Sequence, residues 1–259
     1  MCGRFVITSP PAAIRLVFGY QEQPNFPPRY NVAPTQPIPV VLVDHGIRQF
    51  QLMRWGLMPS WVKDPRQFAL LINARAETVL DKPAFRGAMR RRRCVVPADG
   101  YYEWQRRGAR KQPYFIHPSD GAPLALAALA ETWVGPHGEE VDTVAIITAA
   151  ASAAMAVLHD RVPVTIAAGD LDRWLDCATV SAEEAAELLH APPDGTLLWH
   201  PVSTEVNNVG NDHAGLIEPV ADPAELPQEP SPQSAKKIST SRPARRRKRA
   251  APDGQGSLF

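Results

Sequence analysis

The sequence has no long apolar run and little cysteine. Its longest apolar stretches, 123–130 and 144–151, fall far short of the ~20 residues that a membrane-spanning helix needs. No basic segment followed by an apolar one precedes the first predicted strand, so we expect a cytoplasmic protein rather than an exported one. The three cysteines, Cys2, Cys94 and Cys177, are odd in number and lack the spacing of metal ligands. They predict free thiols in a reducing compartment and argue against a disulfide framework and a zinc site.

An overall excess of charge of one sign is also absent, because 28 lysine and arginine residues face 27 aspartate and glutamate residues. The balance is uneven, since the stretch from Asp222 to the end holds eight basic residues and four acidic ones. That stretch is rich in Pro, Ser, Gln, Ala and Arg, so we expect residues 222–259 to form a disordered basic tail. Its Arg-Arg-Arg-Lys-Arg run predicts loose binding to nucleic acid by counterion release. A merely solubilising tail is an equal alternative.

Residues 2–221 are predicted to form one domain of the α+β class. Short β-type runs, separated by turn signals, recur at 4–7, 38–43, 49–55, 68–72, 93–96, 101–104, 113–116, 124–129, 143–148, 164–167 and 197–201. Helical patterns are short and lie at 11–18, 83–91, 152–158, 170–176 and 182–190. Ser181 and Glu184 form a capping-box signal for the last of them. Many strands with scattered helices, and no regular βαβ alternation, predict curved, mainly antiparallel sheet with short helices.

The chain begins Met-Cys-Gly-Arg-Phe. Initiator methionine is usually removed before a small residue, which would leave Cys2 with a free α-amine and a thiol on adjacent carbons. Such a 1,2-aminothiol reacts with aldehydes, because the amine condenses to an imine and the thiol then closes a five-membered thiazolidine. A terminal amine has a pKa of about 7.7–8.0, so a useful fraction is unprotonated near neutral pH. The alternative is that Cys2 is an ordinary small residue beside a start codon.

Two segments near the middle of the first half combine polar and aromatic residues. Residues 30–35 (Tyr-Asn-Val-Ala-Pro-Thr) are predicted to be a loop. In the segment 54–61, Trp55 and Trp61 flank a glycine and a proline. They are either a platform on which bases stack or anchors of the core.

The next polar cluster is Ile-Asn-Ala-Arg-Ala-Glu, at 72–77. At a strand end Asn73 and Arg75 share a face, which suits a phosphate or a sugar hydroxyl. The alternative is a surface strand with an ion pair to Glu77. Farther along, the arginine run 90–93 indicates a groove that follows phosphates, or an ordinary solvated helix face.

Glu103 and His159 are the candidate acid–base groups. Glu103 lies among bulky aromatic residues, which would desolvate its carboxylate and raise its pKa. The alternative is that Glu103 faces solvent, as a lone glutamate in a strand usually does. His159 begins the segment His-Asp-Arg-Val-Pro. Histidine titrates near neutral pH and Arg161 is a natural phosphate ligand. A histidine after a helix is otherwise a C-terminal cap.

These segments, in their order and spacing, resemble the SOS-response-associated peptidase (SRAP) family, whose members act on abasic sites in DNA. The resemblance runs from Cys2 to about Val220. It is carried by Met-Cys-Gly-Arg-Phe, Tyr-Asn-Val-Ala-Pro-Thr, Trp-Gly-Leu-Met-Pro-Ser-Trp, Ile-Asn-Ala-Arg-Ala-Glu-Thr, Pro-Ala-Asp-Gly-Tyr-Tyr-Glu-Trp, His-Asp-Arg-Val-Pro and Trp-His-Pro-Val-Ser. The chain departs at Val62, where some relatives carry a second aromatic residue.

The resemblance implies that the Cys2 amine attacks the C1′ aldehyde of an opened abasic deoxyribose. The Cys2 thiol then closes a thiazolidine, which leaves a covalent protein–DNA adduct. Residues that match the family's active site are Cys2, Asn73, Glu103 and His159. Glu103 is expected to transfer protons, Asn73 to orient the opened sugar, and His159 to bind near the 3′ phosphate and to assist β-elimination. The positions expected to contact DNA are Arg4, Arg75 and Arg161 beside phosphates, Pro34 and Trp61 over the base stack, and also Thr148.

The family further implies single-stranded DNA or a single-strand/double-strand junction at a stalled fork as substrate, removal of Met1 by the protein itself, and no cofactor or metal. We expect a monomer associated with the nucleoid. The chain ends Gln-Gly-Ser-Leu-Phe, which resembles the peptide that docks bacterial proteins into the sliding clamp. Leu258 and Phe259 would fill a pocket while Gln255 bonds at its rim.

Two other classes of protein compete with this interpretation. An N-terminal-nucleophile peptidase or amidohydrolase would use Cys2 to attack an amide, with its own amine as base. A non-catalytic DNA-binding module would use the arginine run and the tail, and Cys2 would be incidental. Cys2→Ala separates the three, because it removes a covalent adduct in the first case, removes hydrolysis in the second and changes nothing in the third.

Overall fold

Sheet dominates the computed structural model, which describes residues 2–108 and 110–221. The expected basic tail and the clamp-binding residues Gln255, Leu258 and Phe259 lie outside these ranges. The strands are β1 (Phe5–Ile7), β2 (Arg29–Val32), β3 (Pro37–Asp44), β4 (Ile47–Trp55), β5 (Asn73–Arg75), β6 (Arg93–Ala98), β7 (Gly100–Arg107), β8 (Arg110–Pro118), β9 (Leu124–Val134), β10 (Glu140–Ala150), β11 (Arg161–Pro163) and β12 (Leu197–Pro201). The α-helices are α1 (Pro11–Phe18), α2 (Arg86–Arg91), α3 (Leu171–Leu175) and α4 (Ala182–Ala186). The 3-10 turns are η1 (Pro65–Gln67), η2 (Ala76–Thr78), η3 (Met155–Val157), η4 (Ala168–Asp170), η5 (Thr204–Asn207) and η6 (Ala214–Leu216).

The strands form two sheets. One has five strands in the order β12-β8-β7-β1-β2. In the other, β10, β4, β3, β6 and β9 pair in turn and β9 pairs back to β10, which closes a five-stranded barrel, while β5 and β11 add to β10. All pairings are antiparallel except those of β10 with β4 and β5. The predicted α+β class with curved, mainly antiparallel sheet is confirmed.

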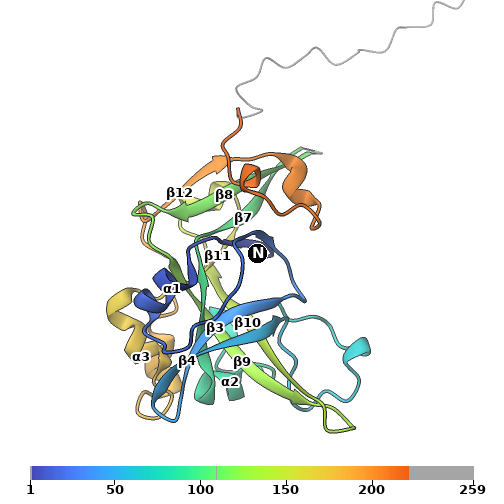
Figure 1. Cartoon of the computed structure of the whole chain (residues 1–259), viewed down its shortest axis with the longest axis vertical. Coiled ribbons are helices and arrows are strands. Elements are labelled where there is room, and N and C mark those ends of the chain that lie inside the picture. The colour runs from blue at the N-terminus through green and yellow to red at the C-terminus, as the bar shows by residue number, and fades with distance from the viewer. Residues whose placement is uncertain (1, 109, 222–259) are drawn as a thin grey trace, which may run out of the picture. The chain divides into compact units, whose positions relative to one another are not determined.

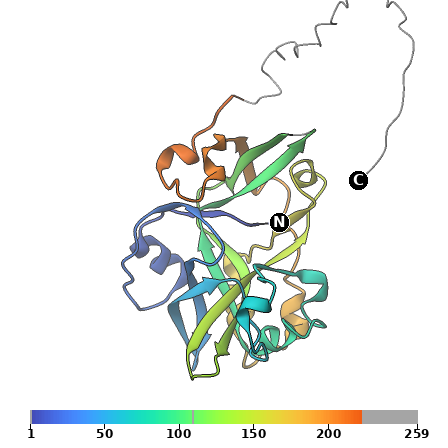
Figure 2. The same cartoon turned by 90° about the vertical axis from the view of Figure 1, so that its right-hand side faces the viewer.

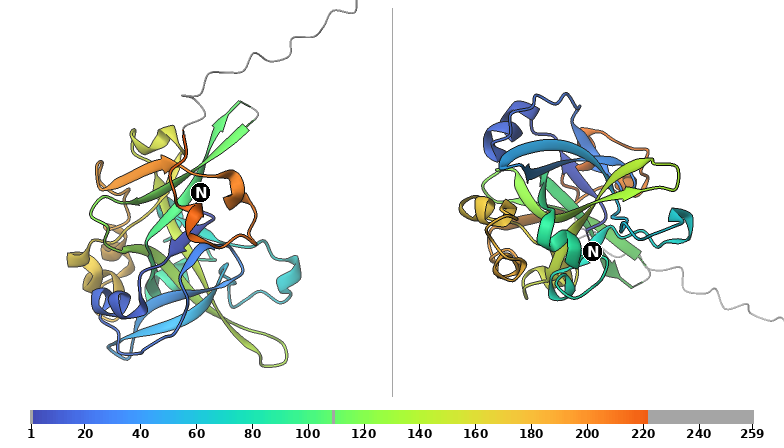
Figure 3. Two further views of the ribbon diagram at one scale, coloured as in Figure 1. Left: turned by 45° about the horizontal axis from the view of Figure 1, so that its top comes forward. Right: turned by 90° about the horizontal axis from the view of Figure 1, so that it is seen from below.

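The first sheet lies above the barrel in Figure 1, and β1 runs near the junction of the two. The β7–β8 hairpin projects from the body at the top of the side view in Figure 2. The β9–β10 hairpin projects at the bottom of Figure 1, and in the view from below in Figure 3 it extends to one side of the body. Within the part of the chain that these views describe, no helix is long and apolar enough to cross a bilayer.

Local signals place the helices well. α1 begins with a proline at its first turn and ends at Gly19, whose φ of 70° is a left-handed conformation that suits glycine. The Ser181 hydroxyl accepts from the Glu184 backbone N–H at 3.1 Å, and the Glu184 carboxylate accepts from the Ser181 N–H at 2.9 Å. The predicted capping box of α4 is therefore confirmed.

Three predictions of local structure are wrong. Residues 68–72 form only an isolated bridge at Leu71, and the strand begins after them as β5. Residues 164–167 likewise form only a bridge, while β11 precedes them. Residues 30–32 belong to β2 rather than to a loop. The polar Asn31 tolerates burial there because its amide donates to the carbonyls of Val206, Asn208 and Asn211.

Arg93, the last residue of the arginine run 90–93, lies in the core. Arg93 is 1% exposed. Its guanidinium donates to the carbonyls of Met89 (3.0 Å), Trp174 (2.7 Å), Asp176 (2.5 Å) and Val180 (2.9 Å). Arg93 thereby ties β6 to α3 and the turn after it, and burial lowers its pKa. The prediction of a groove that follows phosphates along the whole run 90–93 is therefore wrong.

Replacing Arg93 by methionine is expected to destabilise the fold by about 3 kcal/mol, because several buried carbonyls lose their donor. Urea unfolding measures the change. Arg90→Met is the matched control, since Arg90 is exposed on α2, and it should shift stability by less than about 0.5 kcal/mol. Equal stabilities for the two variants would contradict the structural role of Arg93.

Candidate active site

Cys2 leads into β1 and its side chain is buried. Asn73, the first residue of β5, donates from Nδ2 to the Cys2 carbonyl at 2.8 Å. Burial and the nearby Glu103 charge raise the pKa of the Cys2 thiol, while the Arg4 backbone N–H favours its thiolate. The thiol therefore needs a base close by before it reacts as a thiolate.

Glu103 is the third residue after the β6–β7 turn at Gly100 and is 3% exposed. Burial raises the pKa of its carboxyl above the ordinary value near 4.5, and the positive charge of His159 opposes that shift. The predicted desolvation of this carboxylate is confirmed, because its strand turns the side chain inward instead of toward solvent. A carboxyl group with a raised pKa exchanges protons more readily near neutral pH.

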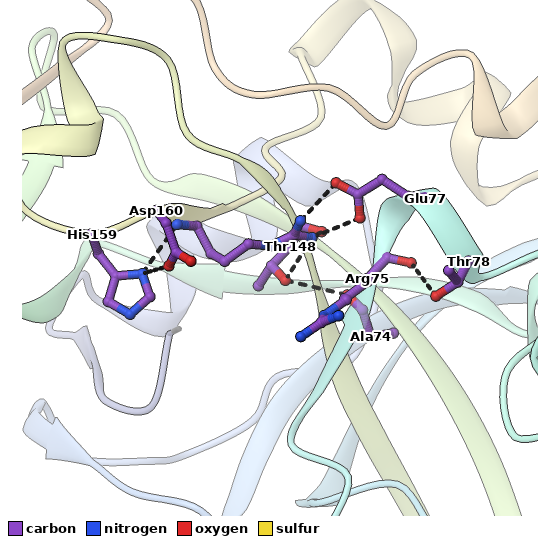
Figure 4. Close-up of polar contacts among 8 residues, drawn as sticks. Ala74, Arg75, Glu77, Thr78, Thr148, His159 and Asp160 are labelled. Carbon is purple, nitrogen blue, oxygen red and sulfur yellow. Dashed lines mark hydrogen bonds and ion pairs between the residues drawn. The ribbon is translucent and has the colours of Figure 1, made fainter.

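His159 lies between η3 and β11 and is half-buried. Its Nδ1 atom is 2.6 Å from an Asp160 carboxylate oxygen and 3.0 Å from the Arg161 backbone nitrogen, as Figure 4 shows. His159 and Glu103 line the same pocket of about 430 Å³, together with residues Trp104, Gln105, Arg106, Lys111, Val157 and Leu158. The pocket gives an imidazole and a carboxyl group a common opening to solvent.

The structure therefore gathers the four predicted active-site residues from four separate segments of the chain. Cys2 touches Asn73 through a hydrogen bond. Cys2 and Glu103 are electrostatically coupled, and Glu103 shares its pocket with His159. The arrangement links a thiol-bearing residue, an amide, a carboxyl group and an imidazole in one region of the fold.

A second cluster surrounds Arg161. Its guanidinium holds the Glu77 carboxylate with two contacts, of 2.6 and 2.9 Å, and also contacts the Thr148 carbonyl. Figure 4 shows this fork beside Arg75, which is exposed at the end of β5. The Arg161 fork lowers the pKa of Glu77. Thr148 is buried, and its hydroxyl donates to the Ala74 carbonyl at 3.4 Å.

Arg4 and the two tryptophans occupy different surroundings. The half-buried Arg4 donates to Asn31 Oδ1 at 2.7 Å and to the Val206 carbonyl at 2.8 Å. Trp55 is fully buried and is a core anchor, whereas Trp61 is 57% exposed with its ring edge-to-face against Phe68. The core-anchor interpretation is confirmed for Trp55, while base stacking by the exposed Trp61 stays a prediction.

Burial also differs between Pro34, the other position expected over the base stack, and Val62, which follows Trp61 in the chain. Pro34 is half-buried after β2. Val62 is buried, and its carbonyl accepts from Trp133 Nε1 at 2.6 Å. Val62, where the chain departs from the family pattern, therefore packs inward. Trp61, the residue before it, presents its aromatic ring to solvent.

Sequence reasoning missed two residues of the site. Glu77 was considered only as a partner of Arg75, but it pairs with Arg161 from a distant segment. Tyr101 has no role in the sequence analysis, yet it shares a face of β7 with Glu103 because the two are two residues apart. The alternation of side chains along a strand was the signal that would have found Tyr101.

Residues 1–209 match the family model described as SOS response associated peptidase (SRAP). The chain belongs to this family. It is 36% identical to the abasic site processing protein HMCES of Gallus gallus, over 85% of this chain and 78% of the relative. It is also 36% identical to the abasic site processing protein YoaM of Bacillus subtilis, over 84% of this chain and 98% of the relative. A crystal structure of a Bacteroides thetaiotaomicron protein shares the fold, with a TM-score of 0.74 and 24% identity over 85% of this chain and 100% of that one.

The SRAP match contains every predicted active-site and DNA-contacting residue, from Cys2 to Arg161. It ends before the predicted clamp-binding peptide. The SRAP domain thus includes the whole arrangement around Cys2 and the Arg161 cluster.

Proposed function

We propose that this SRAP protein processes abasic sites in DNA by forming a thiazolidine between Cys2 and the opened sugar. The observation that carries the proposal is the hydrogen bond from Asn73 to Cys2, together with a buried Glu103 whose charge acts on the Cys2 thiol. Its relatives named as abasic site processing proteins support the substrate. Removal of Met1 exposes the reacting amine, and we propose that the protein removes it itself.

In the first step the unprotonated Cys2 amine attacks the C1′ aldehyde carbon and forms a carbinolamine. Protonation of the carbinolamine oxygen releases water and leaves an iminium carbon. Glu103 in its acid form supplies that proton, and burial favours the acid form because it raises the pKa of the carboxyl. Asn73, already bound to the Cys2 carbonyl, orients the sugar from the other side.

In the second step the Glu103 carboxylate accepts the thiol proton. The sulfur forms a C–S bond to the iminium carbon, and the C=N π pair returns to nitrogen, which gives a neutral ring. His159, in the same pocket, binds near the 3′ phosphate and would take a proton in β-elimination. Arg4, Arg75 and Arg161 are the proposed phosphate contacts, with Thr148 positioned behind Arg161.

The direct test is a denaturing gel of the protein with single-stranded DNA that contains one abasic site. We expect a shifted band that survives heat and detergent. DNA without the abasic site is the control and should give no such band. Absence of the band, with intact mass confirming that Cys2 is the first residue, would reject the covalent mechanism and favour a peptidase or a DNA-binding module.

Arg161→Gln is expected to weaken binding to single-stranded DNA about tenfold at low salt and to reduce the salt slope by about 0.7, because one phosphate contact is lost. Fluorescence anisotropy over a series of salt concentrations measures both quantities. Arg173→Gln is the matched control, since Arg173 also pairs with a glutamate, Glu187, at 2.6 Å. Equal losses of affinity in the two variants would show that Arg161 acts only through the net charge.

We also propose that the terminal Gln-Gly-Ser-Leu-Phe peptide docks into a sliding clamp, which would bring the protein to replication forks at the nucleoid. The proposal rests on two apolar residues and a glutamine at the end of a basic segment. A pulldown with purified clamp compares the full chain with a chain that lacks Leu258 and Phe259. Equal recovery of clamp would reject it.

A further inference from the structure

Tyr101 carries a buried hydroxyl that has no hydrogen-bond partner among the described residues. The side chain is 0% exposed and lies in β7, opposite Phe5 of β1. Tyr101 and Glu103 face the same way, because they are two residues apart on one strand. Cys2, which leads into β1, belongs to the same buried cluster as Tyr101.

The hydroxyl is within electrostatic reach of both reacting groups. Burial raises the pKa of Tyr101 well above its ordinary value, and the charges of Cys2 and Glu103 raise it further. The hydroxyl therefore stays protonated at any working pH. It is a permanent hydrogen-bond donor and never a base.

A buried hydroxyl without a partner lowers stability, and a phenylalanine would fill nearly the same volume without that cost. A second polar atom beside Cys2, Asn73 Oδ1, is likewise buried without a partner among the described residues. A donor and an acceptor thus remain unused around the residue that reacts.

We propose that the Tyr101 hydroxyl is a further catalytic group, which donates a hydrogen bond to the Cys2 sulfur as the sulfur leaves its packed position to close the thiazolidine. The inference rests on the proposed function. The thiol proton passes to Glu103, the sulfur bonds to the iminium carbon, and the π pair returns to nitrogen, while Tyr101 keeps its own proton. Sulfur carries negative charge during this step, and the Arg4 backbone N–H is the other donor that favours it.

The test compares Tyr101→Phe with Tyr102→Phe in the full chain with Met1 removed. Tyr102 is the matched control, because it is the next residue on β7, packs in a different cluster, and donates its hydroxyl to the Tyr30 carbonyl at 2.8 Å. Single-turnover reactions with abasic single-stranded DNA are stopped with a maleimide, which blocks free thiols. Borohydride then traps imine and ring together, whereas heat without reductant leaves only the ring.

For Tyr101→Phe we expect imine formation at the unaltered rate, ring closure about 10- to 100-fold slower, and an unfolding midpoint no lower than that of the unaltered protein. For Tyr102→Phe we expect unaltered ring closure and a lower midpoint. Unchanged ring closure in Tyr101→Phe would overturn the inference about Tyr101 but leave the proposed function standing. Equal slowing of both steps with a lower midpoint would show a packing defect and also overturn it. No adduct with the unaltered protein would instead reject the proposed function.

Discussion

Replacing Cys2 by alanine is expected to abolish the heat-stable adduct with abasic DNA. The variant is used after intact mass has shown that Met1 is removed, so that it still presents an α-amine but has no thiol to close a ring. The amine alone forms an imine, which hydrolyses on heating. The expected loss is complete rather than partial, because the described residues place no other cysteine beside Asn73 and Glu103.

The measurement is the same denaturing gel, run with and without borohydride. In Cys2→Ala a band should appear only with borohydride, whereas the unaltered protein should give a band in both lanes. Cys177→Ala is the control, because that free cysteine is partly exposed and lies in the distant pocket beside Arg173. A heat-stable band in Cys2→Ala would mean that another nucleophile reacts, and the assignment of Cys2 would be wrong.

The sequence predicts the class of the fold because its signals are local. The proline and glycine that bound α1 and the reciprocal side chains that cap α4 act within a few residues of the chain. The two sheets and the closure of β9 onto β10 depend on pairings between distant segments, which no local pattern encodes. The error at β2 has the same origin, since Asn31 is polar by sequence and becomes satisfied only when the distant segment 206–211 folds over it.

The candidate site shows the same division. Cys2, Asn73, Glu103 and His159 belong to motifs with chemistry that a single segment displays, and the family resemblance supplied their roles. The pairing of Arg161 with Glu77 and the unpartnered hydroxyl of Tyr101 arise from tertiary packing. A residue type can suggest a proton donor or a phosphate ligand, but burial and partners decide whether it is available.

Glu103→Gln is expected to slow adduct formation by about 10²–10⁴-fold, because the variant retains the shape and hydrogen bonds of the side chain but exchanges no protons. In the unaltered protein the rate of adduct formation should change with pH around the raised pKa of Glu103, because imine formation needs the acid form of Glu103 and ring closure needs its carboxylate. The variant should lack that dependence. Single-turnover rates across a range of pH test both expectations, with the exposed Glu183→Gln on α4 as the control.

Stability separates this catalytic loss from a folding defect. The pKa of Glu103 is higher in the folded chain than its ordinary value near 4.5, so the folded state binds the extra proton. Stability is therefore greatest below pH 4.5 as far as this group is concerned, and falls as pH rises through the folded pKa. Glu103→Gln removes that decline and should be at least as stable as the unaltered protein at neutral pH. A variant that is both slow and unstable there would indicate that Glu103 supports the fold, and the proton-transfer role would have to pass to His159.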